Sequence, residues 1–221
     1  MSTLSERPAR MRSGRTSSRY RHNAGTRASG PTPQKVVWPD HESMEICEQC
    51  KFRYDDVASE EIAGRLRTGP AGYRSALSGA SPHAVTRRPE PEVWSALEYA
   101  CHVRDVLLIQ RDRAVSAQVE ELPSVARMHR DERVSLCGYA RHPIDEVLAQ
   151  LDMAAGLCAM VFDRLDDTAW SRQLVYNWPT ASEHDLRWLG RHTVHEVEHH
   201  LGDVVAVLSW ADDPIRPGLG A

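Results

Sequence analysis

Apolar residues recur every three to four positions over three long stretches of the chain, which is the spacing of amphipathic helices. The first stretch, "EVWSALEYACHVRDVLLIQRDRAV", follows Pro91, and the second begins near Pro143. The third runs to Trp210 from Ser182, which we interpret as an N-cap because Asp185 stands three positions later. Val, Ile and Thr nowhere alternate with polar residues for long enough to predict strands, so the pattern predicts an all-α body.

A shorter helical pattern precedes these three. It begins near Ser59 and ends at Gly79, and the "TGPAG" at residues 68–72 is expected to interrupt it. The charged, irregular segment 115–142 is expected to connect distant ends of the fold and to act as a lid. Four helices with one long connection predict a four-helix bundle over residues 57–212.

The composition predicts one domain with tails. The chain has 221 residues, of which 41% are hydrophobic and 26% charged, enough for a single core. Residues 1–43 are rich in Arg, Ser, Gly and Pro, which predicts a disordered basic tail, and residues 213–221 are predicted to form a short C-terminal tail. A nucleic-acid partner would depend on the basic tail alone and is not expected.

The chain also lacks the marks of a membrane or secreted protein. No apolar run is long enough for a transmembrane helix, and the N-terminus has no apolar core of a secretory signal. The sequence therefore predicts a cytoplasmic protein with no membrane partner.

The cysteines raise the question of a metal site. There are five, an odd number, so a disulfide framework is not expected. In a lead-in segment at 44–56, "CEQC" places Cys47 and Cys50 at the spacing of half a zinc site, and His41 is near enough to be a third ligand. No second C-x-x-C follows, and such half-sites are often incidental, so the spacing leaves metal binding by this motif open.

Residues 192–204, "HTVHEVEHHLGDV", concentrate metal-capable side chains on one helix. At about 100° per residue, His200 falls within the apolar face of this helix and Glu196 lies on its edge, so both can point into the bundle. Two such side chains one turn apart, completed by a third from another helix, form an open metal site. His102, on the apolar stripe of the helix after Pro91, is our candidate for the third ligand.

Other readings of these histidines stay open. His192, His195 and His199 are expected on the wetter side of the helix, yet a rotation of about 100° would make His195 and His199, or His192 with either, the inward pair. Taken alone, His102 is more often a core histidine with a hydrogen-bond partner, and a histidine-rich helix face can be merely solvated.

The segments "YACHVRDVL" and "VHEVEHHLGDV" together resemble the DinB/YfiT-like superfamily of metal-binding four-helix bundles, over roughly residues 55–210. The resemblance implies an up-down-down-up bundle and a divalent ion, often zinc. One residue of the second helix and two residues one turn apart in the last helix would hold this ion. In this chain these are His102, Glu196 and His200. The Glu in the middle position resembles the branch that contains mycothiol-dependent maleylpyruvate isomerase.

The same resemblance implies an activity. Relatives use low-molecular-weight thiols such as mycothiol or bacillithiol, so the expected function is a metal-dependent thiol S-transferase that activates mycothiol or a similar thiol toward an electrophilic small molecule. Tyr99 and Trp188 are candidates for contacts to the thiol or the substrate. The alternatives are a non-catalytic metal-binding or dimerising protein of the same fold, which could pair as a homodimer, and a metal-dependent hydrolase in which Glu196 acts as a base.

Overall fold

The structure is a computed structural model and describes residues 46–211. The tails predicted at 1–43 and 213–221, and His41, lie outside the described residues. The elements are, in chain order, η1 (Tyr54–Asp56), α1 (Ser59–Thr68), α2 (Pro70–Leu77), α3 (Pro82–Thr86), α4 (Ala96–Val119), β1 (Ser124–Val125), α5 (Arg130–Leu136), η2 (Tyr139–Arg141), α6 (Ile144–Phe162), α7 (Asp167–Trp170), β2 (Gln173–Asn177), β3 (Ala181–Asp185) and α8 (Leu186–Ala211).

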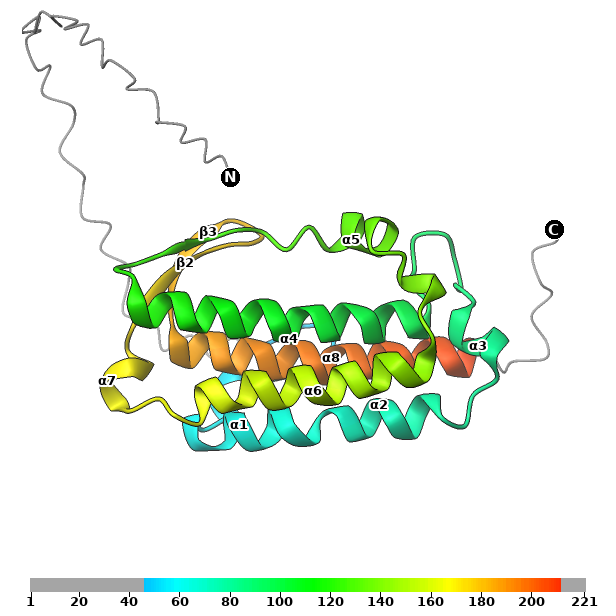
Figure 1. Cartoon of the computed structure of the whole chain (residues 1–221), viewed down its shortest axis with the longest axis horizontal. Helices are drawn as coiled ribbons and strands as arrows, with labels where there is room; N and C mark the ends of the chain where they lie inside the picture. The colour runs from blue at the N-terminus through cyan, green and yellow to red at the C-terminus, as the bar shows by residue number, and fades with distance from the viewer. Residues whose placement is uncertain (1–45, 212–221) are drawn as a thin grey trace, which may run out of the picture. The chain divides into compact units, whose positions relative to one another are not determined.

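The long helices form the predicted four-helix bundle (Figure 1). Helix α4 packs on α6 and α8, and α1 with α2 packs on the other side of the same two helices. The first leg is broken between α1 and α2, at Gly69 and Pro70, as the "TGPAG" stretch predicts. Among residues 46–211, no helix is both long enough and apolar enough to cross a membrane.

Two predicted helix starts are wrong. Helix α4 begins at Ala96 rather than near Pro91, because Ser95 and Glu98 form a capping box: the Ser95 hydroxyl accepts from the Glu98 N–H at 3.3 Å, and the Glu98 carboxylate accepts from the Ser95 N–H at 2.8 Å. Helix α8 begins at Leu186 rather than Ser182, and its first turn is capped by Asp185, which accepts from the Trp188 N–H at 2.7 Å.

A small sheet lies before α8, where the sequence predicted no strands. Its order is β1-β2-β3, with β2 and β3 antiparallel from the pair Gln173↔Asp185 to Asn177↔Ala181, and β1 parallel to β2. Buried and less buried residues alternate along β2, but over only five positions, and β3 reads "ASEHD" with no β-branched residue. The strands thus depend on pairing with each other rather than on a strong pattern of their own.

The long connection between α4 and α6 is tied to α4 by a buried polar network. The Asp105 carboxylate on α4 accepts from the Tyr139 hydroxyl at 2.6 Å, from Arg104 at 2.9 Å and from Arg133 at 3.3 Å. Tyr139 and Arg133 belong to η2 and α5 of the connection. Because Tyr139 and Asp105 are buried, these bonds hold the connection along α4 in a fixed register.

The capping box at the start of α4 generates a prediction about stability. Burial opposes the charged form of Glu98, but the bidentate Arg88 guanidinium at 2.7 and 2.8 Å, with Ser95, outweighs it and lowers the pKa of the carboxyl. We expect Glu98→Gln to lower the free energy of unfolding by about 1–2 kcal/mol at neutral pH. A carboxyl whose pKa is lowered by folding stabilises the fold fully above the pKa that it has in the unfolded chain, and this contribution is lost as the pH falls. The deficit of Glu98→Gln should therefore shrink as the pH falls below 4.5.

Urea denaturation of the metal-free protein at about pH 7 and at about pH 3.5 measures this deficit on either side of the carboxyl titration. The matched control is Arg67→Gln, which breaks an exposed ion pair to Asp163 and should change the free energy by less than about 0.5 kcal/mol. A deficit for Glu98→Gln no larger than the control's, or one that does not depend on pH, would contradict the account.

Candidate metal centre

Three metal-capable side chains from two helices converge in the bundle. His102 comes from α4, and Glu196 and His200 lie one turn apart on α8. The Nε2 atom of His102 lies 3.8 Å from Oε2 of Glu196, and Nε2 of His200 lies 3.6 Å from the same oxygen. One ligand atom from each residue can be chosen so that all three lie within 4.8 Å of one another. We call these three residues the triad.

The triad contains a histidine whose polar atoms are unsatisfied. His102 is 2% exposed, and neither of its ring nitrogens has a hydrogen-bond partner within the described part of the chain. Trp94 packs on its ring at a centroid distance of 5.0 Å, and His200 meets it edge to face at 4.9 Å. A buried nitrogen without a partner destabilises the fold, so a group that binds the nitrogen lone pair would relieve that cost.

The charges in the triad are those that a cation requires. Burial favours the neutral forms of Glu196 and His102 and lowers the pKa of His102, but the neighbouring imidazoles hold the pKa of Glu196 well below its usual range. Burial also opposes charge on His200, yet Asp203 and Glu196 raise its pKa to about 9. At neutral pH the triad thus offers a carboxylate and a neutral imidazole, and a proton on His200 occupies the place that a divalent cation would take.

The second imidazole is oriented by a carboxylate on its own helix. Nδ1 of His200 lies 2.8 Å from Oδ2 of Asp203, which directs Nε2 toward Glu196. Such a carboxylate–histidine pair is the usual support of a metal-binding imidazole.

The remaining histidines of α8 do not all lie on the wetter side. That expectation is wrong, because the lead-in segment before α1 covers this face of α8: His195 is only 8% exposed, and the side chains of His192 and His199, at 15% and 12%, are less exposed than that of Glu196, at 20%. His195 and His199 face Cys47 and Cys50 there. His192 contacts the hydroxyl of Tyr54, at 2.8 Å from its Nδ1.

A pocket of about 360 Å³ opens beside the triad. Residues 127–132, just before and within α5, form one wall, so part of the segment expected to be a lid does border the site. The guanidinium of Arg113 lies 4.7 Å from the ring centroid of Tyr176, and that of Arg127 lies 4.5 Å from that of Trp178. The lining residues are His102, Arg113, Arg127, Met128, His129, Arg130, Asp131, Glu132, Tyr176, Trp178, His192 and Glu196.

The sequence is similar to one family of known proteins. A family model described as the DinB superfamily matches residues 65–204. The chain belongs to the DinB superfamily. No curated protein sequence matches the chain.

Two solved structures share the DinB-like fold. YfiT from Bacillus subtilis, described as a probable metal-dependent hydrolase with an unusual four-helix bundle topology, is similar with a TM-score of 0.61 and 17% identity, over 67% of this chain and 85% of that one. The mycothiol-dependent maleylpyruvate isomerase is similar with a TM-score of 0.56 and 18% identity, over 68% of this chain and 62% of the isomerase. At these identities the likeness shows the fold.

Of the two residues expected to contact a ligand, Tyr99 packs against the triad, whereas Trp188 packs against Tyr176 and His192, which line the pocket. The Tyr99 ring packs on His200 at a centroid distance of 5.4 Å. Trp188 stacks between His184 and His192, at 3.7 and 4.7 Å. Neither lines the pocket described above, so their contact with a thiol or substrate stays a prediction.

Sequence reasoning missed several residues of the site. Asp203 could have been found, because it stands one turn after His199 on the same helix. Tyr54 and Arg113 carry no such signal, since Tyr54 lies 138 residues before the His192 that it contacts. Arg113 lies within the predicted helical stretch, but its place in the pocket depends on how α4 packs against the rest of the fold.

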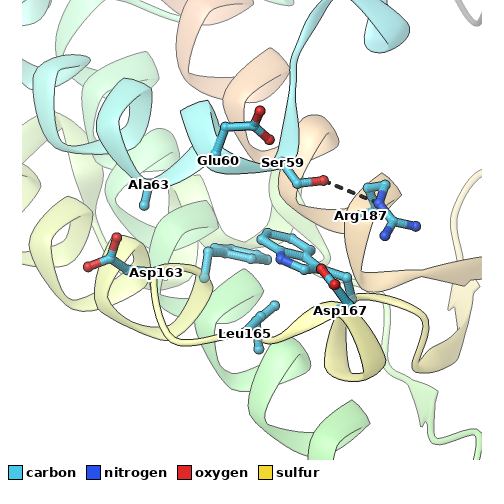
Figure 2. Close-up of a pocket in the computed structure, with 9 residues that line it drawn as sticks. Ser59, Glu60, Ala63, Asp163, Leu165, Asp167 and Arg187 are labelled. Carbon is cyan, nitrogen blue, oxygen red and sulfur yellow. Dashed lines mark hydrogen bonds between the residues drawn. The ribbon is translucent and has the colours of Figure 1, made fainter.

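A second pocket, of about 460 Å³, lies between α1, α7 and the beginning of α8 and has a different character (Figure 2). Phe162 and Trp170 stack at a centroid distance of 5.9 Å, and Arg187 donates to Ser59 at 3.2 Å. Its lining includes Glu60, Asp163 and Asp167 but no histidine or cysteine. We therefore place the candidate chemistry at the triad.

The unsatisfied nitrogens of His102 generate a second prediction. In chelator, His102→Leu removes two unpaired buried polar atoms, so its free energy of unfolding should stay within about 1 kcal/mol of the wild type or exceed it. Tyr139→Phe is the matched control: it removes a buried hydroxyl that does have a partner, Asp105, and should lower the free energy by about 1–2 kcal/mol. Urea denaturation measures both, and a larger loss for His102→Leu than for Tyr139→Phe would show that His102 is a satisfied core residue.

Proposed function

We propose that the chain binds one divalent metal ion, preferentially zinc, through His102, Glu196 and His200, and uses it to activate a low-molecular-weight thiol for attack on an electrophilic small molecule. The observation that carries the proposal is the triad beside a pocket, with two buried histidines of which one has unsatisfied nitrogens. Mycothiol is the first candidate for the thiol, because a structure of similar fold is a mycothiol-dependent isomerase.

The donor set favours zinc over the hard cations. Calcium and magnesium take oxygen ligands, whereas two imidazoles and one carboxylate form a set that zinc uses when one coordination position remains open. His102 and Glu196 both line the pocket, so an open position would face it. A ligand that enters the pocket would thus meet the ion directly.

A divalent ion at this place would supply acidity, by lowering the pKa of a thiol that binds at its open position. The chain's own residues do the rest. Asp203 fixes the orientation of His200, and Trp94 packs on His102 and keeps water from its ring. In the transfer, the thiol proton leaves to solvent, the sulfur forms a bond to the electrophilic carbon, and the leaving group departs with the electrons of its former bond.

The pocket indicates the charge of the electrophile. Arg113, Arg127 and Arg130 line it, against Asp131 and Glu132 on α5. Guanidinium groups bind carboxylates and phosphates through paired hydrogen bonds, so an electrophile with an anionic group fits the arginine side of this pocket. A transfer of this kind needs a reduced thiol pool, which agrees with the cytoplasmic location expected from the sequence.

Metal-dependent hydrolysis is the second candidate. It is favoured by the similarity to YfiT, a probable metal-dependent hydrolase, of which this chain covers 85%. In that case water would enter the open position and Glu196 would act as the base. The position of Glu196 is less suited to this role, because one of its oxygens lies between the Nε2 atoms of His102 and His200, as expected for a ligand.

A metal titration tests the triad. We expect His102→Ala, Glu196→Ala and His200→Ala each to weaken cobalt or zinc binding more than about 100-fold, because each removes one of three ligands. All variants also carry Cys47→Ser and Cys50→Ser, so that the cluster of these cysteines with His195 and His199 does not contribute thiol ligands to the measured binding. Glu198→Ala is the matched control, since this exposed carboxylate on the same helix pairs with Arg65. Retention of metal in all three triad variants would refute the site.

The thiol is tested on the same cobalt-loaded protein. Adding mycothiol should produce a thiolate-to-cobalt charge-transfer band that the three triad variants do not show. Turnover of electrophiles should then require the thiol. Turnover of an ester or amide without any thiol, together with no such band, would favour the hydrolase.

A further inference from the structure

A second cluster of metal-capable side chains lies on another face of α8 and shares no residue with the triad. Cys47 and Cys50 from the lead-in segment meet His195 and His199, and one ligand atom of each can be chosen so that all four lie within 4.8 Å of one another. The sulfur of Cys47 lies 3.7 Å from Nδ1 of His199. Two sulfurs and two imidazole nitrogens gathered in this way are the ligand set of a structural zinc site.

His195 points an unsatisfied nitrogen into this cluster. Its Nδ1 lies 3.3 Å from the hydroxyl of Tyr54, which leaves Nε2 for the cysteines. That Nε2 is buried and has no hydrogen-bond partner. Within residues 46–211 only three buried side-chain nitrogen or oxygen atoms lack a partner, and the other two belong to His102 of the triad. Both clusters therefore contain a buried histidine nitrogen that lacks a hydrogen-bond partner.

His199 is supported in the way that metal-binding imidazoles are. Its Nδ1 faces Cys47, and its Nε2 lies 3.6 Å from Oδ2 of Asp203. Both histidines of the cluster thus have one nitrogen toward the cysteines and the other beside a polar group that holds the ring.

The backbone of the lead-in segment presents both thiols to α8. The Cys47 N–H donates to the Phe52 carbonyl at 2.9 Å, and the Lys51 N–H donates to the Cys47 carbonyl at 2.8 Å. Lys51 has a φ of 63°, a left-handed conformation that closes the turn directly after Cys50. The segment is also held to α8 by Tyr54, whose hydroxyl contacts His192 and His195, and by Asp55, which pairs with Arg191.

We propose that Cys47, Cys50, His195 and His199 bind a second zinc ion, which fastens the lead-in segment to α8. Four protein ligands leave no open position, so this ion is structural. The third and fourth ligands are histidines of α8, and His41, which is near enough in sequence to be a candidate, lies outside the described residues. The proposal shares no ligand with the triad and does not depend on the proposed function.

The experiment follows the thiols of the full-length protein. Cobalt loading should produce a thiolate-to-cobalt charge-transfer band without any added thiol, and zinc should displace it. Zinc should also slow alkylation of Cys47 and Cys50 more than about 10-fold, as measured by mass spectrometry. Cys137, which is exposed and outside the cluster, is the internal control and should react at an unchanged rate.

Variants separate this site from the triad. The band and the protection should be lost in Cys50→Ser and in His195→Ala/His199→Ala, and should persist in Glu196→Ala and in the control Cys137→Ser. Equal alkylation rates with and without zinc would overturn the proposal. So would a band that survives in His195→Ala/His199→Ala, because the histidines would then not be ligands. If the triad alone does not bind metal, the wild-type protein should still show the charge-transfer band.

Discussion

The rotation of α8 about its own axis is the constraint on which both metal-capable clusters depend. With 3.6 residues per turn, Glu196 and His200 face α4 while His195 and His199 face the lead-in segment. The rotation is fixed by buried apolar residues on the same helix, Leu189, Val197 and Val204 among them. A rotation of the helix by one residue, about 100°, would move both pairs away from their partners.

Asp203 connects the two faces of this helix. Its Oδ2 lies 2.8 Å from Nδ1 of His200 and 3.6 Å from Nε2 of His199, so one carboxylate orients an imidazole in each cluster. Burying imidazole nitrogens without hydrogen-bond partners destabilises the metal-free fold, and the residues that carry them, His102 and His195, lie one in each cluster. The fold thus gives up stability where it gathers ligands, as functional sites commonly do.

Periodicity was enough to predict much of this fold and part of the site. It predicted the start of α6 and the inward position of Glu196 and His200, and the Gly and Pro residues at 68–72 predicted the break near Gly69, because these features depend on local turns and on one helix face. It could not predict β2 and β3, which form through pairing with each other. Nor could it bring Cys47 to His199, since that contact spans 152 residues and depends on how the lead-in segment folds back.

Anomalous X-ray diffraction from crystals of the zinc-loaded protein, collected on both sides of the zinc absorption edge, tests the central claim most directly. The account predicts a zinc peak between the imidazoles of His102 and His200 and the carboxylate of Glu196. A zinc-loaded crystal with no peak at this place, in which His102 instead hydrogen-bonds to ordered water, would contradict it.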